Sequence, residues 1–192
     1  MGPLNKWPEP KAIAPALFFW TIFWIFGLFY WRYDANFAVS ANKVFNEGQW
    51  WTVFTALFTH SGVGHLISNT PMFLVFGMLL GNYFGWVVFP FSCIVLGAIT
   101  NLITIYLQDP TISVVGASGM VYAMVAMWLV YYFKFDTHYS WPIRLSRVVA
   151  FSLVVMYPST YKQHISYLSH AIGFMTGLIG AILSLKFVIV KS

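Results

Sequence analysis

An uncharged apolar run from about Ile13 to Trp31 constrains this chain most, because about 20 such residues cross a bilayer as a helix. Only 8% of the 192 residues are charged, against roughly 25% in soluble domains. Five further apolar runs are predicted to form spans, at about 64–80, 84–107, 118–134, 143–157 and 166–187, and the fifth of the six spans, 143–157, is the shortest. We therefore expect an all-α integral membrane protein, a six-helix bundle forming one domain over residues 1–192.

The segment from Arg32 to about Thr59 is too polar to span a membrane and too aromatic for an ordinary loop. It is predicted to be partly helical and to lie at the membrane interface as a first loop. The first eight residues lack the features of a signal peptide, so the first span is expected to remain as an anchor. Cys93 is the single cysteine, which excludes an intrachain disulfide.

The basic residues predict the orientation, since Lys and Arg gather on the cytoplasmic side of membrane proteins. With six spans both termini share a side, and that side holds Lys6, Lys11, Lys134, Arg144, Arg147, Lys186 and Lys191. Both termini are therefore predicted to be cytoplasmic. Because the few charges lie between apolar runs, the net charge of +5 is interpreted as a topology signal, and no nucleic-acid partner is expected.

Several polar side chains lie where apolar spans begin, and polar groups inside a membrane indicate function. His60, His65 and Asn69 lie around the start of the second span, Ser118 starts the fourth, and His170 lies near the start of the sixth. These three spans run in the same direction, so their first turns share one depth. The polar groups are therefore predicted to face one another near the outer surface.

Three explanations other than catalysis are open for this set. The groups could hydrogen-bond helices together, as polar residues in membrane helices do. Zinc could bind to His60, His65 and His170, although no His-Glu-x-x-His motif exists and no carboxylate lies within a span. Proton or ion transport is the third, but matching broken helices are not evident. We expect no metal and no cofactor.

Nucleophilic catalysis explains the set more fully. Ser118 is a nucleophile that needs a base, and His170 is the candidate. No acid is placed to orient this histidine, so a dyad is expected, with Tyr122, one turn below Ser118, supporting the imidazole. His65, Asn69 and the Ser118 N–H suit an oxyanion hole. As an alternative, Ser118 merely caps its helix.

Small residues are arranged to bring these helices close together. Gly173 and Gly177 form a Gly-x-x-x-Gly motif that starts one turn after His170, and Gly116 and Gly119 flank Ser118. Such motifs let membrane helices approach closely. The sixth span is therefore predicted to pack against the fourth.

These residues resemble a known family. Gly116-Ala117-Ser118-Gly119 is similar to the Gly-x-Ser-Gly of rhomboid intramembrane serine proteases, and the glycines after His170 resemble their sixth-helix motif. The histidines and asparagine of the second span fit as well, in a short form of the bacterial GlpG type that lacks a soluble N-terminal domain. One departure is that the Trp-Arg pair often found in the first loop reads Trp51-Thr52.

The resemblance implies that Ser118 is the nucleophile, that His170 is the general base, and that both lie in a bacterial inner membrane. The implied substrates are transmembrane proteins with small or helix-weakening residues at the cleavage site. Membrane lipids are the other implied partners. The short fifth span and the loop at 158–163 are expected to move to admit substrate. The alternative is a catalytically silent relative that binds transmembrane helices without cutting them.

Overall fold

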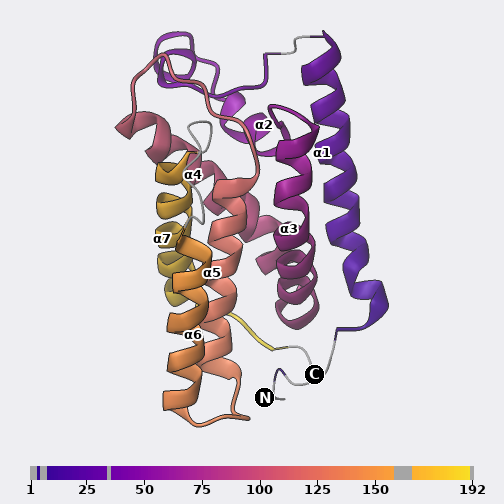
Figure 1. The fold of residues 1–192 in the computed structure, drawn as a ribbon, viewed down its shortest axis with the longest axis vertical. Coiled ribbons are helices and arrows are strands. Elements are labelled where there is room, and N and C mark those ends of the chain that lie inside the picture. Colours follow the sequence, from indigo (N-terminus) through magenta and orange to yellow (C-terminus); the bar gives the residue numbers. More distant parts are fainter. Residues whose placement is uncertain (1–3, 5–7, 34–35, 158–165, 191–192) are drawn as a thin grey trace.

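The computed structural model describes residues 4, 8–33, 36–157 and 166–190 (Figure 1). Within these ranges the regular structure is helical, and an isolated antiparallel bridge joins Val39 to Val114. The α-helices are α1 (Ala14–Tyr33), α2 (Thr52–Phe58), α3 (Val63–Phe84), α4 (Cys93–Leu107), α5 (Ser118–Phe135), α6 (Trp141–Met156) and α7 (Tyr167–Ser184). Short 3-10 or π-helical turns form η1 (Pro10–Ile13), η2 (Asn42–Asn46) and η3 (Val87–Ser92).

Among the described residues, four helical segments are long and apolar enough to cross a membrane, namely Pro10–Tyr33, Val63–Phe84, Val87–Leu107 and Tyr167–Ser184. The two remaining long helices, α5 and α6, differ in burial and in charge. Eleven of the 18 residues of α5 are buried, so its sides meet protein and need not be strongly apolar. α6 has 16 residues and carries Arg144 and Arg147. The expected count of six spans therefore remains part of the proposal below.

The third predicted span, 84–107, differs from the observed path. Phe84 is the last residue of α3, and Gly85, which follows it, has a φ of 81°, a conformation that favours glycine. Helical structure resumes at Val87 but is interrupted at Phe89, whose φ and ψ are −126° and 125°. The physical reason is Pro90, because the residue before a proline is disfavoured in the helical region.

The bundle is arranged around α5, which contacts α3, α4, α6 and α7. In Figure 1, α1 lies at one edge beside α3, whereas α6 and α7 lie on the opposite side. The helices α3, α5 and α7 all begin at the upper end of this view, and α1 begins at the lower end, where residues 185–190 also lie. The first turns of α3, α5 and α7 are therefore at one end of the molecule.

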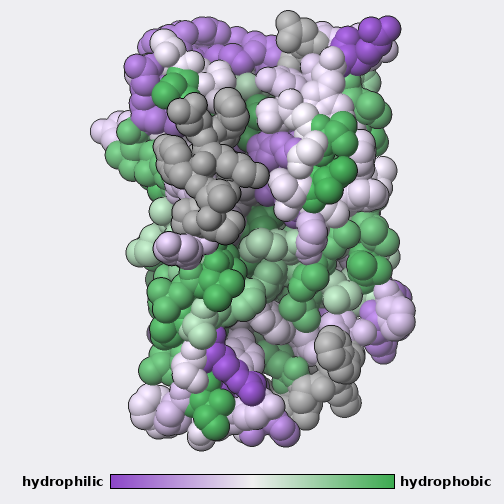
Figure 2. Space-filling model, in the orientation of Figure 1, coloured by the Kyte–Doolittle hydropathy of each residue, from purple (hydrophilic) through white to green (hydrophobic). Residues whose placement is uncertain are grey.

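The segment before α3 packs against this same end. The Asn101 side chain of α4, 2% exposed, donates to the Val53 carbonyl of α2 at 2.9 Å. Outside this contact the segment presents large rings, since Phe45, Trp50, Trp51 and Phe54 are each about half exposed. Figure 2 shows hydrophilic residues gathered at the upper end, above an apolar middle. Exposed rings beside a polar surface fit a membrane interface.

Thr52 occupies the position at which the first loop departs from the Trp-Arg pair of the family that the sequence resembles. Its side chain is fully buried, and its hydroxyl donates to the Gln49 carbonyl at 2.7 Å. The residue therefore serves the local turn at the start of α2.

Candidate active site

Ser118 is the first residue of α5 and is half-buried. The turn before it depends on Gly116, whose φ of 120° is rarely adopted by residues with a side chain. The Gly116 N–H donates to the Ala56 carbonyl of α2 at 2.9 Å, which fixes the turn to α2. A Cβ at Gly116 would lie 2.7 Å from Cε1 of His65. The glycine therefore lets the His65 ring approach the turn that presents Ser118.

His60 lies beneath this turn and is fully buried. Its Nε2 accepts a hydrogen bond from the Ala117 N–H at 3.4 Å, and its carbonyl accepts one from Trp31 Nε1 at 2.6 Å. The rings of His60 and His65 meet edge to face with centroids 5.2 Å apart. His60 therefore positions the backbone that leads into Ser118.

His65 is oriented by a residue that the sequence analysis did not select. Ser61 Oγ lies 3.1 Å from His65 Nδ1, four residues along the chain. The other ring nitrogen, Nε2, faces the Gly116 turn, 3.0 Å from where a Cβ of Gly116 would stand. The i, i+4 spacing of Ser61 and His65 is the signal that could have found this pair, although Ser61 precedes the helix.

Asn69 lies one turn further along α3 and is half-buried. Its Nδ2 donates to the His65 carbonyl at 3.0 Å. A primary amide carries two N–H donors, so this bond occupies one of them. The second remains available to a ligand.

His170 comes from the first turn of α7, and its ring stacks on Tyr122 of α5. The centroids are 4.2 Å apart and the planes differ by 12°. The Tyr122 hydroxyl donates to the Val155 carbonyl of α6 at 3.2 Å, and the Tyr167 ring meets His170 edge to face at 6.1 Å. The imidazole thus lies between two aromatic rings, and one of them, Tyr122, follows Ser118 by one turn of α5. Tyr167 is a second residue that the sequence analysis did not select.

The backbones of α5 and α7 touch beside this histidine. A Cβ at Gly173 would lie 2.9 Å from the carbonyl carbon of Gly119, and one at Gly177 would lie 2.6 Å from Cα of Ala123. Real Cβ atoms do not approach other atoms so closely. Small residues are therefore what lets α7 bring His170 alongside the first turn of α5.

Ser118 and His170 belong to facing first turns, but no direct hydrogen bond joins these two described residues. Catalytic hydrogen bonds are often long before substrate binds and shorten in the complex. Both side chains are half-buried, so each retains access to a ligand.

The zinc alternative receives no support from this arrangement. Among the described residues, no three side chains of His, Cys, Asp or Glu come together as metal ligands would. His60 and His65 form one pair, whereas His170 stacks on Tyr122.

Comparison with known proteins identifies one family. A family model described as "Rhomboid domain" matches residues 47–187. The chain is 30% identical over 95 residues to "RHOMBOID-like protein 9, chloroplastic" of Arabidopsis thaliana, covering 49% of this chain and 21% of that protein. It is 25% identical over 150 residues to "RHOMBOID-like protein 1" of the same plant, covering 74% of this chain and 36% of the relative. The chain thus spans well under half the length of these relatives.

Proposed function

Because this chain belongs to the rhomboid family, we propose that it is an intramembrane serine endopeptidase with Ser118 and His170 as its catalytic dyad. Its substrates are transmembrane segments of other membrane proteins. The observation that carries this proposal is the stacking of His170 on Tyr122, one turn from Ser118 and across a glycine-lined helix contact. Helix packing alone does not require a half-buried hydroxyl on the first turn of α5 and a half-buried imidazole on the first turn of α7.

In the proposed mechanism Ser118 Oγ attacks the carbonyl carbon of the scissile peptide bond. His170 takes the serine proton and passes it to the departing amine as the C–N bond breaks. A water molecule then attacks the acyl-serine and gives a proton to His170, and His170 returns this proton to Ser118 Oγ as the second product leaves. The stacked Tyr122 ring holds the imidazole in place of an acidic third residue.

The developing oxyanion is assigned to donors on two helices. A Ser61 hydroxyl that donates to His65 Nδ1 leaves the ring proton on Nε2, the nitrogen that faces the Gly116 turn. This N–H, the second N–H of Asn69 and the Ser118 backbone amide supply three donors. One oxyanion donor is worth about 10²–10³ in rate.

The proposal includes six spans with both termini cytoplasmic, so that Ser118 lies near the outer leaflet. The distribution of Lys and Arg supports this orientation, and the common starting end of α3, α5 and α7 is consistent with it. The motif set around Ser118 and His170 favours a bacterial inner-membrane enzyme of the GlpG type. A reporter fused to the C-terminus that is active only outside the cell would refute the orientation.

Substrate entry is assigned to movement of α6. None of its residues is buried, so its displacement costs little packing energy. The loop at 158–163, also expected to move, lies outside the described residues. A crosslink between Phe76→Cys on α3 and Phe151→Cys on α6, whose rings meet at 6.1 Å, tests the gate in a Cys93→Ala background. We expect the oxidised pair to lose cleavage of a transmembrane substrate and dithiothreitol to restore it; unchanged cleavage after crosslinking would exclude this gate.

The decisive experiment is reaction of the purified protein with a fluorophosphonate in detergent. We expect labelling at Ser118 that Ser118→Ala and His170→Ala both abolish, together with cleavage of a panel of single-span proteins. Ser146→Ala, which removes an exposed hydroxyl on α6, is the matched control. Wild-type protein that binds transmembrane helices but neither reacts nor cleaves would support the alternative, a catalytically silent relative.

A further inference from the structure

A cavity of about 540 Å³ lies between α3, α5 and α6, outside the candidate active site. Apolar side chains form most of its wall, among them Val75 and Phe76 of α3, Trp128 of α5 and Phe151 of α6. Tyr132 and Arg147 contribute polar groups to the same cavity. Its volume falls within the range of small-ligand sites, about 300–1,000 Å³.

The guanidinium of Arg147 is held at this cavity by two aromatic residues. Arg147 Nη1 donates to the Tyr132 hydroxyl at 3.2 Å, and its Cζ lies 3.7 Å from the centroid of the Tyr139 ring. The residue is exposed, and within the described ranges no carboxylate forms an ion pair with it. A fixed cation without a protein counterion, at the border of an apolar cavity, is complementary to an amphiphile with an anionic head.

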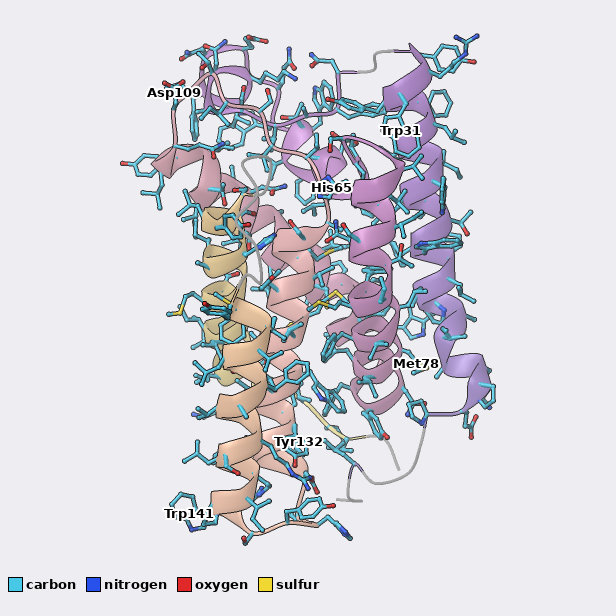
Figure 3. The ribbon with its side chains drawn as sticks, viewed as in Figure 1. Trp31, His65, Met78, Asp109, Tyr132 and Trp141 are labelled. Atoms are coloured by element: carbon cyan, nitrogen blue, oxygen red, sulfur yellow. The ribbon has the colours of Figure 1, made fainter. Side chains whose placement is uncertain are left out.

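The polar end of the cavity, at Tyr132 and Arg147, is far from Ser118 along the bundle. Tyr132 follows Ser118 by fourteen residues on α5, which corresponds to about 21 Å of helix. Figure 3 shows Tyr132 and Trp141 toward the lower end of the bundle, and His65 toward the other. Lys134 and Arg144 belong to the same lower end as Arg147, so this end is basic. Basic residues beside a membrane attract anionic headgroups.

We propose that this cavity binds one acyl chain of an anionic phospholipid, with the lipid phosphate on Arg147. The guanidinium has N–H groups left after its bond to Tyr132, and Arg pairs with phosphate through two parallel N–H donors. A substrate helix is a poorer occupant, because a helix about 10 Å wide would fill the cavity with roughly one turn. This binding does not depend on the proposed protease activity.

The first test measures affinity by native mass spectrometry of the detergent-purified full chain. Phosphatidylglycerol and phosphatidylcholine with identical chains are titrated separately. We expect phosphatidylglycerol to bind about fivefold more tightly, the preference that one Arg at a membrane surface provides. Arg147→Gln removes that preference. Arg32→Gln, which deletes an exposed cation from the last turn of α1, retains it.

The second test locates the acyl chain by fluorescence quenching. Phosphatidylglycerol with brominated chains, added at a low ratio of lipid to protein, quenches tryptophans that touch the chain. We expect Trp128→Phe to remove a large share of the quenching, and Trp86→Phe, an exposed ring outside the cavity, to remove little.

Three outcomes would overturn the proposal. The first is equal affinity of the wild type for the two lipids. The second is a preference that persists in Arg147→Gln or falls equally in Arg32→Gln, which indicates a general charge effect. The third is quenching unchanged by Trp128→Phe, which places the lipid elsewhere on the protein.

Discussion

Replacing Gly173 by alanine tests how the α5–α7 contact places His170. The new Cβ would stand 2.9 Å from the Gly119 carbonyl carbon and closer still to its oxygen, whereas ordinary contacts begin at 3.4 Å. The atoms that the new Cβ meets are backbone atoms of Gly119, which cannot rotate aside as a side chain can. The whole of α7 must therefore withdraw from α5 by roughly 1 Å. His170, three residues earlier on α7, moves with it.

The opposing free-energy terms predict that Gly173→Ala lowers the stability of the protein. Overpacking of this kind costs about 1–3 kcal/mol, whereas replacing glycine by alanine within a helix gains about 1 kcal/mol at most. A displacement of about 1 Å between reacting groups lowers rates by about 10²-fold. We therefore expect Gly173→Ala to lower the thermal unfolding midpoint in detergent and to slow fluorophosphonate labelling of Ser118 about 100-fold.

Gly180→Ala on the same helix is the matched control. The atoms nearest to its Cβ would belong to the Leu96 side chain, with the methyl carbons 2.9 Å and 3.0 Å away, and a leucine side chain can rotate aside. We expect labelling within about threefold of wild type for this variant. Gly173→Ala protein that unfolds at the wild-type midpoint and reacts at the wild-type rate would refute the argument. A lowered unfolding midpoint together with wild-type labelling would support the packing argument. It would reject the inference that this helix contact sets the reactivity of Ser118.

Substitutions at three other residues, each with its own readout, probe the site and its supports. Ser61→Ala removes the partner of His65 Nδ1, and we expect a fall in kcat of about tenfold with KM little changed, measured on a transmembrane substrate. Tyr122→Phe keeps the ring that stacks on His170 and is expected to retain most activity, whereas Tyr122→Ala is expected to lose most activity. Equal activities of the two variants would show that the stacked ring does not contribute to catalysis. Asn101→Leu leaves the Val53 carbonyl unsatisfied and should destabilise the fold by about 1–3 kcal/mol in chemical denaturation, while exposed Asn46→Leu should not.

The sequence alone was informative about the local features of this protein. The length and apolarity of its runs predicted a helical membrane protein, because a bilayer imposes about 20 residues on each span. The rhomboid match supports that class, and in the described part of the chain four helical segments have the required length and hydropathy. The small residues flanking Ser118 and following His170 were readable as well, since spacing along one helix sets which residues share a face. Pro90 indicates a helix break at Phe89, and the predicted continuous span 84–107 did not take this proline into account.

Contacts between distant segments were decided only by the tertiary structure. The bond from the Ala117 N–H to His60, 57 residues apart, depends on how α2 and α5 are placed, which no local pattern specifies. The approach of His65 to Gly116 likewise requires the rotation of α3 toward the first turn of α5. Arg147 looked in the sequence like one more topology charge, and only the packing of α6 placed it at an apolar cavity. Helix positions follow from composition and spacing, whereas the pairing of their faces follows from the mutual fit of side chains across the bundle.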